Sequence, residues 1–124
     1  MRILIVDDNE RVRRGVRALL SYAANCEVCG EAVDGADGLQ KARETLPDLI
    51  LVDVSMPGPD GLETARLLRQ AMPEVKLIIM SQHDPVQLLP RAIEAGAHAC
   101  VDKGRLDSDL LATIESLAGS SGTS

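Results

Sequence analysis

The sequence predicts an α/β fold, (βα)5, in which a doubly wound, parallel five-stranded sheet is covered by helices on both faces. Five short apolar runs alternate with five longer amphipathic segments, the pattern of repeated strand and helix units. The runs are apolar almost throughout, as expected for parallel strands buried on both faces. A chain of 124 residues is expected to form one domain and to bury roughly two thirds of the surface that it exposes when unfolded.

The predicted strands and helices follow one another along the whole chain. Strands are expected at residues 2–6 (RILIV), 26–32 (CEVCGEA), 48–52 (DLILV), 75–80 (VKLIIM) and 98–101 (HACV). A helix is expected after each of them, near residues 10–23, 36–45, 61–71, 86–95 and 106–118. Glycine and proline residues separate the segments and mark the turns, at Gly35, Pro47, Pro57, Gly58, Pro59, Pro73, Gly96 and Gly104.

Two segments are expected to depart from regular structure. Pro85 suits the first turn of the fourth helix, but Pro90 lies five residues further on, where proline removes a backbone hydrogen bond. This helix is therefore predicted to be short, kinked or mobile. Residues 119–124 (GSSGTS) have no apolar anchor, which predicts a flexible tail or the start of a linker after a domain of residues 1–118.

Composition and charge argue against several classes of function. Aromatic residues make up 1% of the chain, with Tyr22 as the single one, which leaves no stacking platform for bases or flavin. The formal net charge is −6, from 19 acidic and 13 basic residues, so this chain alone is not expected to bind DNA. Neither a signal peptide nor an apolar stretch of 18 residues is recognisable, which predicts a cytoplasmic protein that does not bind membranes.

The cysteines are Cys26, Cys29 and Cys100. Cys26 and Cys29 form a C-x-x-C pair, a spacing found in metal and redox sites, but no second Cys or His pair accompanies it. Ordinary reduced thiols are the favoured interpretation for a cytoplasmic chain.

Polar side chains follow the predicted strands. Asp7 and Asp8 end the first strand, Asp53 the third and Ser81 the fourth, and Lys103 comes near the end of the fifth. In a doubly wound sheet these carboxyl ends meet at the edge where ligands bind. Two carboxylates about 4 Å apart repel by roughly 4 kcal/mol at an effective dielectric near 20, so a cation is expected among them. A small set of carboxylate ligands with water favours Mg²⁺ over Ca²⁺.

Each of these residues also has a plainer interpretation. Taken singly, Asp7, Asp8 or Ser81 fits a helix cap or a turn. A lysine in a loop, such as Lys103, is commonly a solvated surface residue. Capping and solvation do not explain why the whole set falls at one edge of the predicted sheet.

The same residues resemble the receiver domain of bacterial two-component response regulators. The resemblance rests on D-D at 7–8, D-V-S-M-P-G-P-D-G at 53–61, Ser81 and K-G at 103–104, and it extends from Arg2 to about Leu117. C-G-E-A-V-D-G at 29–35 and the K-G pair look most like the subgroup with a C-terminal helix-turn-helix output domain, the LuxR/NarL type. A flavodoxin-like sheet of strand order 2-1-3-4-5 is implied.

The resemblance also implies a role for each site residue. Asp53 would accept a phosphoryl group from a sensor histidine kinase or a small phosphodonor, and Ser81 and Lys103 would contact the phosphoryl oxygens. The implied Mg²⁺ ligands are Asp8, Asp53, the backbone carbonyl of Ser55 and, through water, Asp7. An acyl phosphate adds roughly 1.5 to 2 negative charges and would bias the loops and the fourth helix toward a second packing.

The implied function is a signalling switch, and the domain would catalyse only its own Mg²⁺-dependent phosphorylation and dephosphorylation. Transcription would be controlled through an output domain that is absent from this chain, which alone would contact DNA. A sensor histidine kinase is the expected partner. A homodimer is compatible with the resemblance, although the periodicity does not distinguish a dimer face.

Two departures from the family pattern keep other hypotheses open. Cys100 stands where the family usually has the Tyr or Phe that reports the switch, and Gln82 stands where many receivers carry a small residue. Both are compatible with an interaction module that signals without phosphorylation, although the complete set of site residues speaks against it. A phosphohydrolase with an aspartyl nucleophile is the third hypothesis, but such enzymes commonly place a second acid where this chain has Ser55.

Overall fold

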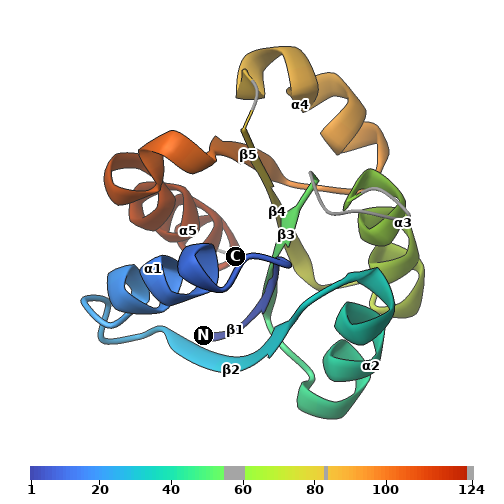
Figure 1. The fold of residues 1–124 in the computed structure, drawn as a ribbon, viewed down its shortest axis with the longest axis horizontal. Coiled ribbons are helices and arrows are strands. Elements are labelled where there is room, and N and C mark those ends of the chain that lie inside the picture. Colours follow the sequence, from blue (N-terminus) through green and yellow to red (C-terminus); the bar gives the residue numbers. More distant parts are fainter. Residues whose placement is uncertain (55–60, 83, 123–124) are drawn as a thin grey trace.

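The computed structural model describes residues 1–54, 61–82 and 84–122 of the chain. Strands and helices alternate along these residues (Figure 1). They are β1 (Arg2–Val6), α1 (Glu10–Leu20), β2 (Glu27–Ala32), α2 (Gly35–Thr45), β3 (Leu49–Asp53), α3 (Gly61–Ala71), β4 (Lys76–Ser81), α4 (Pro85–Glu94), β5 (Ala99–Asp102), the 3₁₀ turn η1 (Lys103–Arg105) and α5 (Leu106–Gly122).

The strands form one parallel sheet in the order β2-β1-β3-β4-β5. In Figure 1, α1 and α5 lie on one side of this sheet, and α2, α3 and α4 lie on the other. The predicted doubly wound fold and its implied strand order are therefore confirmed. All strands run in one direction, so their carboxyl ends meet at a single edge.

Alternate side chains of each central strand enter two separate cores. On β1, Leu4 and Val6 face the core beneath α2, α3 and α4, whereas Ile3 and Ile5 face the core beneath α1 and α5. All four are fully buried. Each such side chain contributes roughly 1.5–3 kcal/mol when it is removed from water. Burial on both faces explains why the strands are apolar at consecutive positions.

Two predicted helix ends were wrong. The first helix ends at Leu20 rather than at residue 23, because the Tyr22 and Ala23 N–H groups bond to the carbonyls three residues earlier, Leu19 and Leu20, instead of four. Tight turns follow, and they bring the Glu27 N–H to the Met1 carbonyl at 2.9 Å. The last helix continues to Gly122, four residues beyond the predicted end. The description of residues 119–124 as a tail or linker stays a prediction.

The fourth helix is short, as predicted. It has 10 residues, whereas the other four α-helices have 11 or more. Asp84 caps it by accepting from the Val86 N–H, Pro85 occupies the first turn and Pro90 lies inside it. A kink or mobility at Pro90 stays a prediction. No helix in the described ranges is long and apolar enough to cross a membrane.

The cysteines are unpaired thiols, as predicted. Cys26 packs against the core beneath α1 and α5, and Cys29 packs against the opposite core. The two sulfur atoms of the C-x-x-C pair therefore face different sides of the sheet, which gives the pair no shared site.

Candidate functional site

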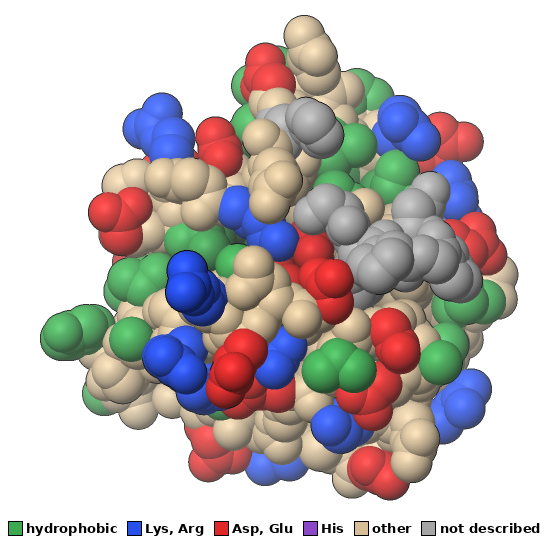
Figure 2. All heavy atoms as spheres, in the orientation of Figure 1, with side chains coloured by type: hydrophobic (Ala, Val, Ile, Leu, Met, Phe, Trp, Pro, Cys, Tyr) green, Lys and Arg blue, Asp and Glu red, His purple; other side chains and the backbone are tan. Residues whose placement is uncertain are grey.

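The ends of β1 and β3 bring three carboxylates together. These strands are neighbours with Val6 opposite Val52, so Asp7, which directly follows β1, and Asp53, the last residue of β3, lie alongside one another. Oxygens of Asp7, Asp8 and Asp53 all lie within 4.8 Å of each other. Asp7 and Asp53 are 0% and 1% exposed, whereas Asp8 is exposed. Acidic and basic side chains adjoin near the middle of the face drawn in Figure 2.

Lys103 supplies a positive charge to this cluster. It begins η1 directly after β5, and its ammonium lies 2.9 Å from Asp7 Oδ2 and 3.0 Å from Asp53 Oδ1. Its side chain is only 8% exposed. Burial alone would lower the pKa of Lys103, but the hydrogen bonds and charges of the two carboxylates outweigh it, so the pKa is raised. The lysine therefore stays charged and is not the solvated residue of the plainer interpretation.

The Asp7 carboxylate is a buried acid within the cluster. Burial raises its pKa, and the nearby Asp53 charge adds to this, against the lowering effects of the Asn9 N–H and of Lys103. Asp7 Oδ1 accepts from the Asn9 N–H at 2.8 Å, and Asp7 Oδ2 is paired with the Lys103 ammonium at 2.9 Å. One lysine facing three carboxylates leaves excess negative charge. An oxygen-only donor set of this kind fits Mg²⁺.

The β1–α1 turn is held by several hydrogen bonds. The Asp7 N–H donates to the Ala32 carbonyl at 3.0 Å, and Asn9 caps α1 by accepting from the Arg11 and Val12 N–H groups. Arg13 donates to the Asp7 carbonyl at 2.6 Å. Sequence reasoning identified Asp7 and Asp8 but missed Asn9 and Arg13. The Asn-x-x pattern before a helix is a signal for the cap, but no local pattern marks Arg13.

The start of α3 packs directly on the Asp53 backbone. A Cβ atom added to Gly61 would lie 2.3 Å from the Asp53 carbonyl oxygen and 2.4 Å from Val54 Cα. Glycine is therefore required by close approach at this position. Ser55, whose carbonyl was the implied metal ligand, lies outside the described residues, as do Pro57, Gly58 and Pro59.

Ser81, Gln82 and Cys100 have different surroundings. Ser81 is fully buried at the end of β4, and the register sets it beside Asp102 and one residue past the partner of Asp53. Gln82 is exposed. Cys100 is half-buried against the core beneath α2, α3 and α4, and burial, with the Asp102 charge, raises its pKa to about 11. It is a small core side chain and an unreactive thiol at neutral pH.

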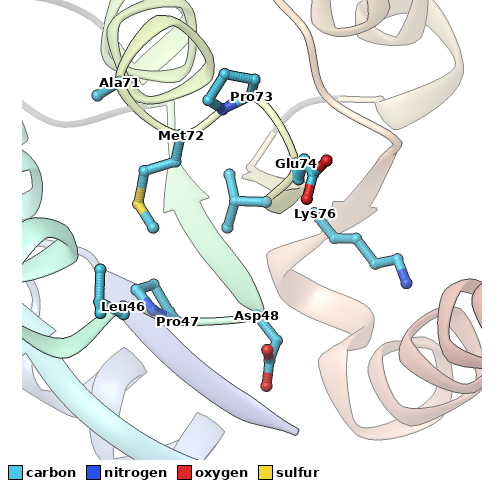
Figure 3. Close-up of a pocket in the computed structure, with 9 residues that line it drawn as sticks. Leu46, Pro47, Asp48, Ala71, Met72, Pro73, Glu74 and Lys76 are labelled. Atoms are coloured by element: carbon cyan, nitrogen blue, oxygen red, sulfur yellow. The ribbon is translucent and has the colours of Figure 1, made fainter.

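An open cavity of about 690 Å³ lies at the opposite edge of the sheet, at the amino-terminal ends of β3 and β4. Figure 3 shows Met72 pointing toward Leu46 and Pro47, whereas Asp48 and Lys76 point outward. None of the clustered carboxylates lines it. The cavity and the acidic cluster are therefore separate features of the molecule.

The fold and the cluster define a class of doubly wound domains that hold several carboxylates and a lysine at the carboxyl edge of the sheet. Residues 3–115 match the model of the response regulator receiver domain. The chain therefore belongs to this family, which confirms the resemblance drawn from the motifs. Receiver domains are parts of signalling proteins rather than classical enzymes, and they bind Mg²⁺ at an acidic pocket.

The similar proteins include LuxR/NarL-type regulators. The response regulator GacA of Pseudomonas viridiflava is 38% identical over 104 residues, which cover 84% of this chain and 49% of that protein. The response regulator UvrY of Escherichia coli K12 is 35% identical over 115 residues, which cover 93% and 53%. A LuxR-family response regulator structure from Aurantimonas sp. SI85-9A1 has a TM-score of 0.88 at 35% identity, over 95% of this chain and 85% of that one.

The chain spans about half the length of the curated relatives that it matches. Response regulators of this type partner with sensor histidine kinases and bind DNA through output domains. The described residues of this chain supply only the receiver fold and its acidic cluster.

Proposed function

We propose that this domain is a phosphorylation-controlled switch in which Asp53 accepts the phosphoryl group. The main support is that the buried Asp53 carboxylate lies 3.0 Å from the Lys103 ammonium and within 4.8 Å of oxygens of two further carboxylates. A lone buried carboxylate would repel an anionic donor. The lysine offsets that repulsion and stabilises the equatorial phosphoryl oxygens in the transition state.

The transfer replaces one bond to phosphorus by another. A carboxylate oxygen of Asp53 bonds to phosphorus while the bond to the leaving group breaks, and the electron pair leaves with a kinase imidazole nitrogen or with the acetate of acetyl phosphate. Lys103 and Ser81 would contact the transferred oxygens. Hydrolysis follows when water attacks phosphorus, which releases orthophosphate and restores the carboxylate.

Asp8 and Asp53 would hold Mg²⁺ directly, and Asp7 would bind it through water. When bound, Mg²⁺ supplies charge neutralisation for the carboxylates and for the phosphoryl oxygens. The carbonyl of Ser55 would complete the protein ligands.

The wider role follows from the family. The domain would act in the cytoplasm, where a sensor histidine kinase would supply the phosphoryl group, and the added charge would change the surface near α4 and β5. A homodimer and an output domain that binds DNA would convert this change into control of transcription. Cys100 lacks the ring that usually reports the switch, so the readout would depend on Ser81 and the α4 backbone.

The test is to treat the purified chain with acetyl phosphate, with and without Mg²⁺, and to locate added phosphate by mass spectrometry. Modification that requires Mg²⁺ and is confined to Asp53 is expected. Asp53→Asn should abolish it, and the exposed control Asp107→Asn should retain it. Labelling at another residue would contradict the proposal. Normal partner binding by an unlabelled chain would instead favour the phosphorylation-independent module.

A further inference from the structure

We propose that Arg13 is a positioning residue that orients the Asp7–Asp8 peptide so that the carboxylates of the cluster can bind a divalent cation. This inference rests on the proposed metal site. Arg13 lies on α1, outside the cluster, and among the described interactions it contacts the cluster through the main chain of Asp7.

The contact of Arg13 with Asp7 is a short, charged hydrogen bond. One guanidinium nitrogen donates to the Asp7 carbonyl at 2.6 Å, and Asp7 is 0% exposed. Water therefore does not reach this carbonyl while Arg13 is in place. A buried carbonyl that loses its partner tends to rotate toward another donor.

The carbonyl of Asp7 and the N–H of Asp8 belong to one planar peptide unit. A group that fixes the direction of the carbonyl therefore also fixes the backbone from which the Asp8 side chain extends. Asp8 is the exposed carboxylate of the cluster, the one that an incoming cation meets first. Rotation of this peptide would move the Asp8 oxygens relative to those of Asp53.

A second contact holds the guanidinium itself. Arg13 Nε lies 3.0 Å from Oε1 of Glu31, the second-to-last residue of β2. Lys41 of α2 donates to the Glu31 carbonyl at 2.6 Å. The Arg13 side chain is 13% exposed. The planar fork thus bridges β2 and the β1–α1 turn, a geometry that lysine cannot reproduce with one ammonium.

The neighbouring arginines of α1 provide matched controls. Arg17 pairs with the other oxygen of Glu31, and Arg14 pairs with Glu10 at the surface. Neither has a contact with Asp7 among the described interactions. Substitution of Arg14 or Arg17 by glutamine removes one positive charge from α1 but keeps the Arg13 donor to the Asp7 carbonyl.

The experiment is calorimetric titration of the whole chain with Mg²⁺, in the wild type and in Arg13→Gln, Arg13→Lys, Arg14→Gln and Arg17→Gln, alongside thermal unfolding without metal. Arg13→Gln is expected to raise the Kd for Mg²⁺ by about 10-fold or more, as loss of a group that orients metal ligands does. Arg13→Lys should raise it several-fold, and both controls should stay within about 2-fold. The Asp53 labelling of Arg13→Gln should recover at saturating Mg²⁺.

A folded Arg13→Gln that binds Mg²⁺ as the wild type does would overturn the role of Arg13. If Arg13→Gln does not fold, Arg13→Lys decides: an unchanged Kd overturns the proposal, and a raised one supports it. A wild type that binds no Mg²⁺ would overturn the metal site and this inference together. A wild type that binds Mg²⁺ but is not labelled on Asp53 would overturn the proposed function while leaving Arg13 to be judged by the Kd.

Discussion

Asp7 and Asp8 are adjacent in the chain, yet their carboxylates have opposite surroundings. Asp7 is buried, accepts from the Asn9 N–H and contacts Lys103, whereas Asp8 is exposed. The plainer interpretation of Asp7 as a turn residue and its membership of the acidic cluster are therefore both correct. Asp8 adds negative charge to the cluster at the rim, where water still screens it.

Asp8→Asn is expected to have opposite effects with and without metal. Without Mg²⁺, the variant loses the repulsion between Asp8 and the Asp7 and Asp53 carboxylates, whose oxygens lie within 4.8 Å. The gain in stability is about 1 kcal/mol or less, because Asp8 is exposed to water. With Mg²⁺ the wild type should gain more in melting temperature than the variant, because metal binding stabilises the folded state by mass action. Differential scanning calorimetry at several Mg²⁺ concentrations measures both.

The exposed residue Asp107 is a suitable control for this substitution, because Asp107→Asn removes the same charge away from the cluster. An Asp8→Asn variant that Mg²⁺ stabilises as strongly as the wild type would contradict a metal role for Asp8.

At the residue scale, the acids and the lysine could be predicted because each follows a strand end that is visible in the sequence. Their convergence then follows from the parallel sheet alone. Arg13 and Gly61 could not be assigned contacts with the site in this way. Their contacts with the Asp7 and Asp53 backbones depend on how α1 and α3 dock on the sheet.

At the element scale, the first residue of α3 packs closely against the Asp53 backbone. Gly61→Ala places a Cβ atom 2.3 Å from the Asp53 carbonyl oxygen. Overpacking of this kind costs about 1–3 kcal/mol, and the displaced Asp53 backbone should also slow labelling. Urea unfolding and acetyl phosphate labelling measure the two effects.

Gly15 of α1 gives the matched control, because nothing lies within 4 Å of a Cβ atom added there. Gly15→Ala is expected to stabilise the chain by about 0.5–1 kcal/mol through helix propensity, with labelling unchanged. Equal effects of the two substitutions would contradict close packing at Gly61.

The α4 helix contains a proline, Pro90, that can be replaced. Pro90 has no N–H to donate to the Val86 carbonyl one turn earlier. Pro90→Ala should slow amide hydrogen exchange in α4 and leave exchange in α5 unchanged. Since α4 is the element that phosphorylation is proposed to shift, the variant should also respond less to Asp53 labelling. Exchange in α4 that is unaffected by the substitution would show that Pro90 does not weaken the helix.

Strand positions were predicted within one residue, most clearly for β1, β3 and β4, because central strands that are buried on both faces have continuous apolar runs. The end of α1 was not predicted correctly, since Ala23 and Ala24 continue a composition that favours helix. The chain leaves the helix there because β2 must begin beside Met1. That constraint comes from the pairing of strands in the sheet, which cannot be read from the hydrophobic periodicity of the sequence.

At the scale of the whole molecule, the two edges of the sheet carry different polar networks. The acidic cluster occupies the carboxyl edge. At the other edge, Arg69 of α3 donates to the Gly96 carbonyl at 2.7 Å and to the Pro73 carbonyl at 2.8 Å. This arginine joins α3 to the turn between α4 and β5. A movement of α4 that displaced this turn would therefore also change the contact of Arg69 with the Gly96 carbonyl.

His98 makes this second edge sensitive to pH. Its Nδ1 accepts from the Leu77 N–H at 3.2 Å, which requires a neutral ring. Burial, followed by the charges of Arg69 and Lys76, lowers the pKa of His98 below the ordinary value of 6.5. The unfolded chain therefore takes up this proton at a higher pH than the folded chain. The contribution of His98 to stability is complete above pH 6.5 and is lost as pH falls through the lower, folded value.

We therefore expect the free energy of unfolding to decrease between pH 7.5 and about 5.5, less steeply in His98→Gln than in its parent. Both chains should carry His83→Gln, which removes the other of the two histidines in the sequence. Urea unfolding at several pH values gives the slopes, and carboxyl groups with ordinary pKa values contribute little in this range. Identical slopes would show that His98 titrates alike in both states. A steeper slope in the parent would show that His98 takes up a proton when the chain unfolds, because the folded chain holds its ring neutral at the hydrogen bond from the Leu77 N–H.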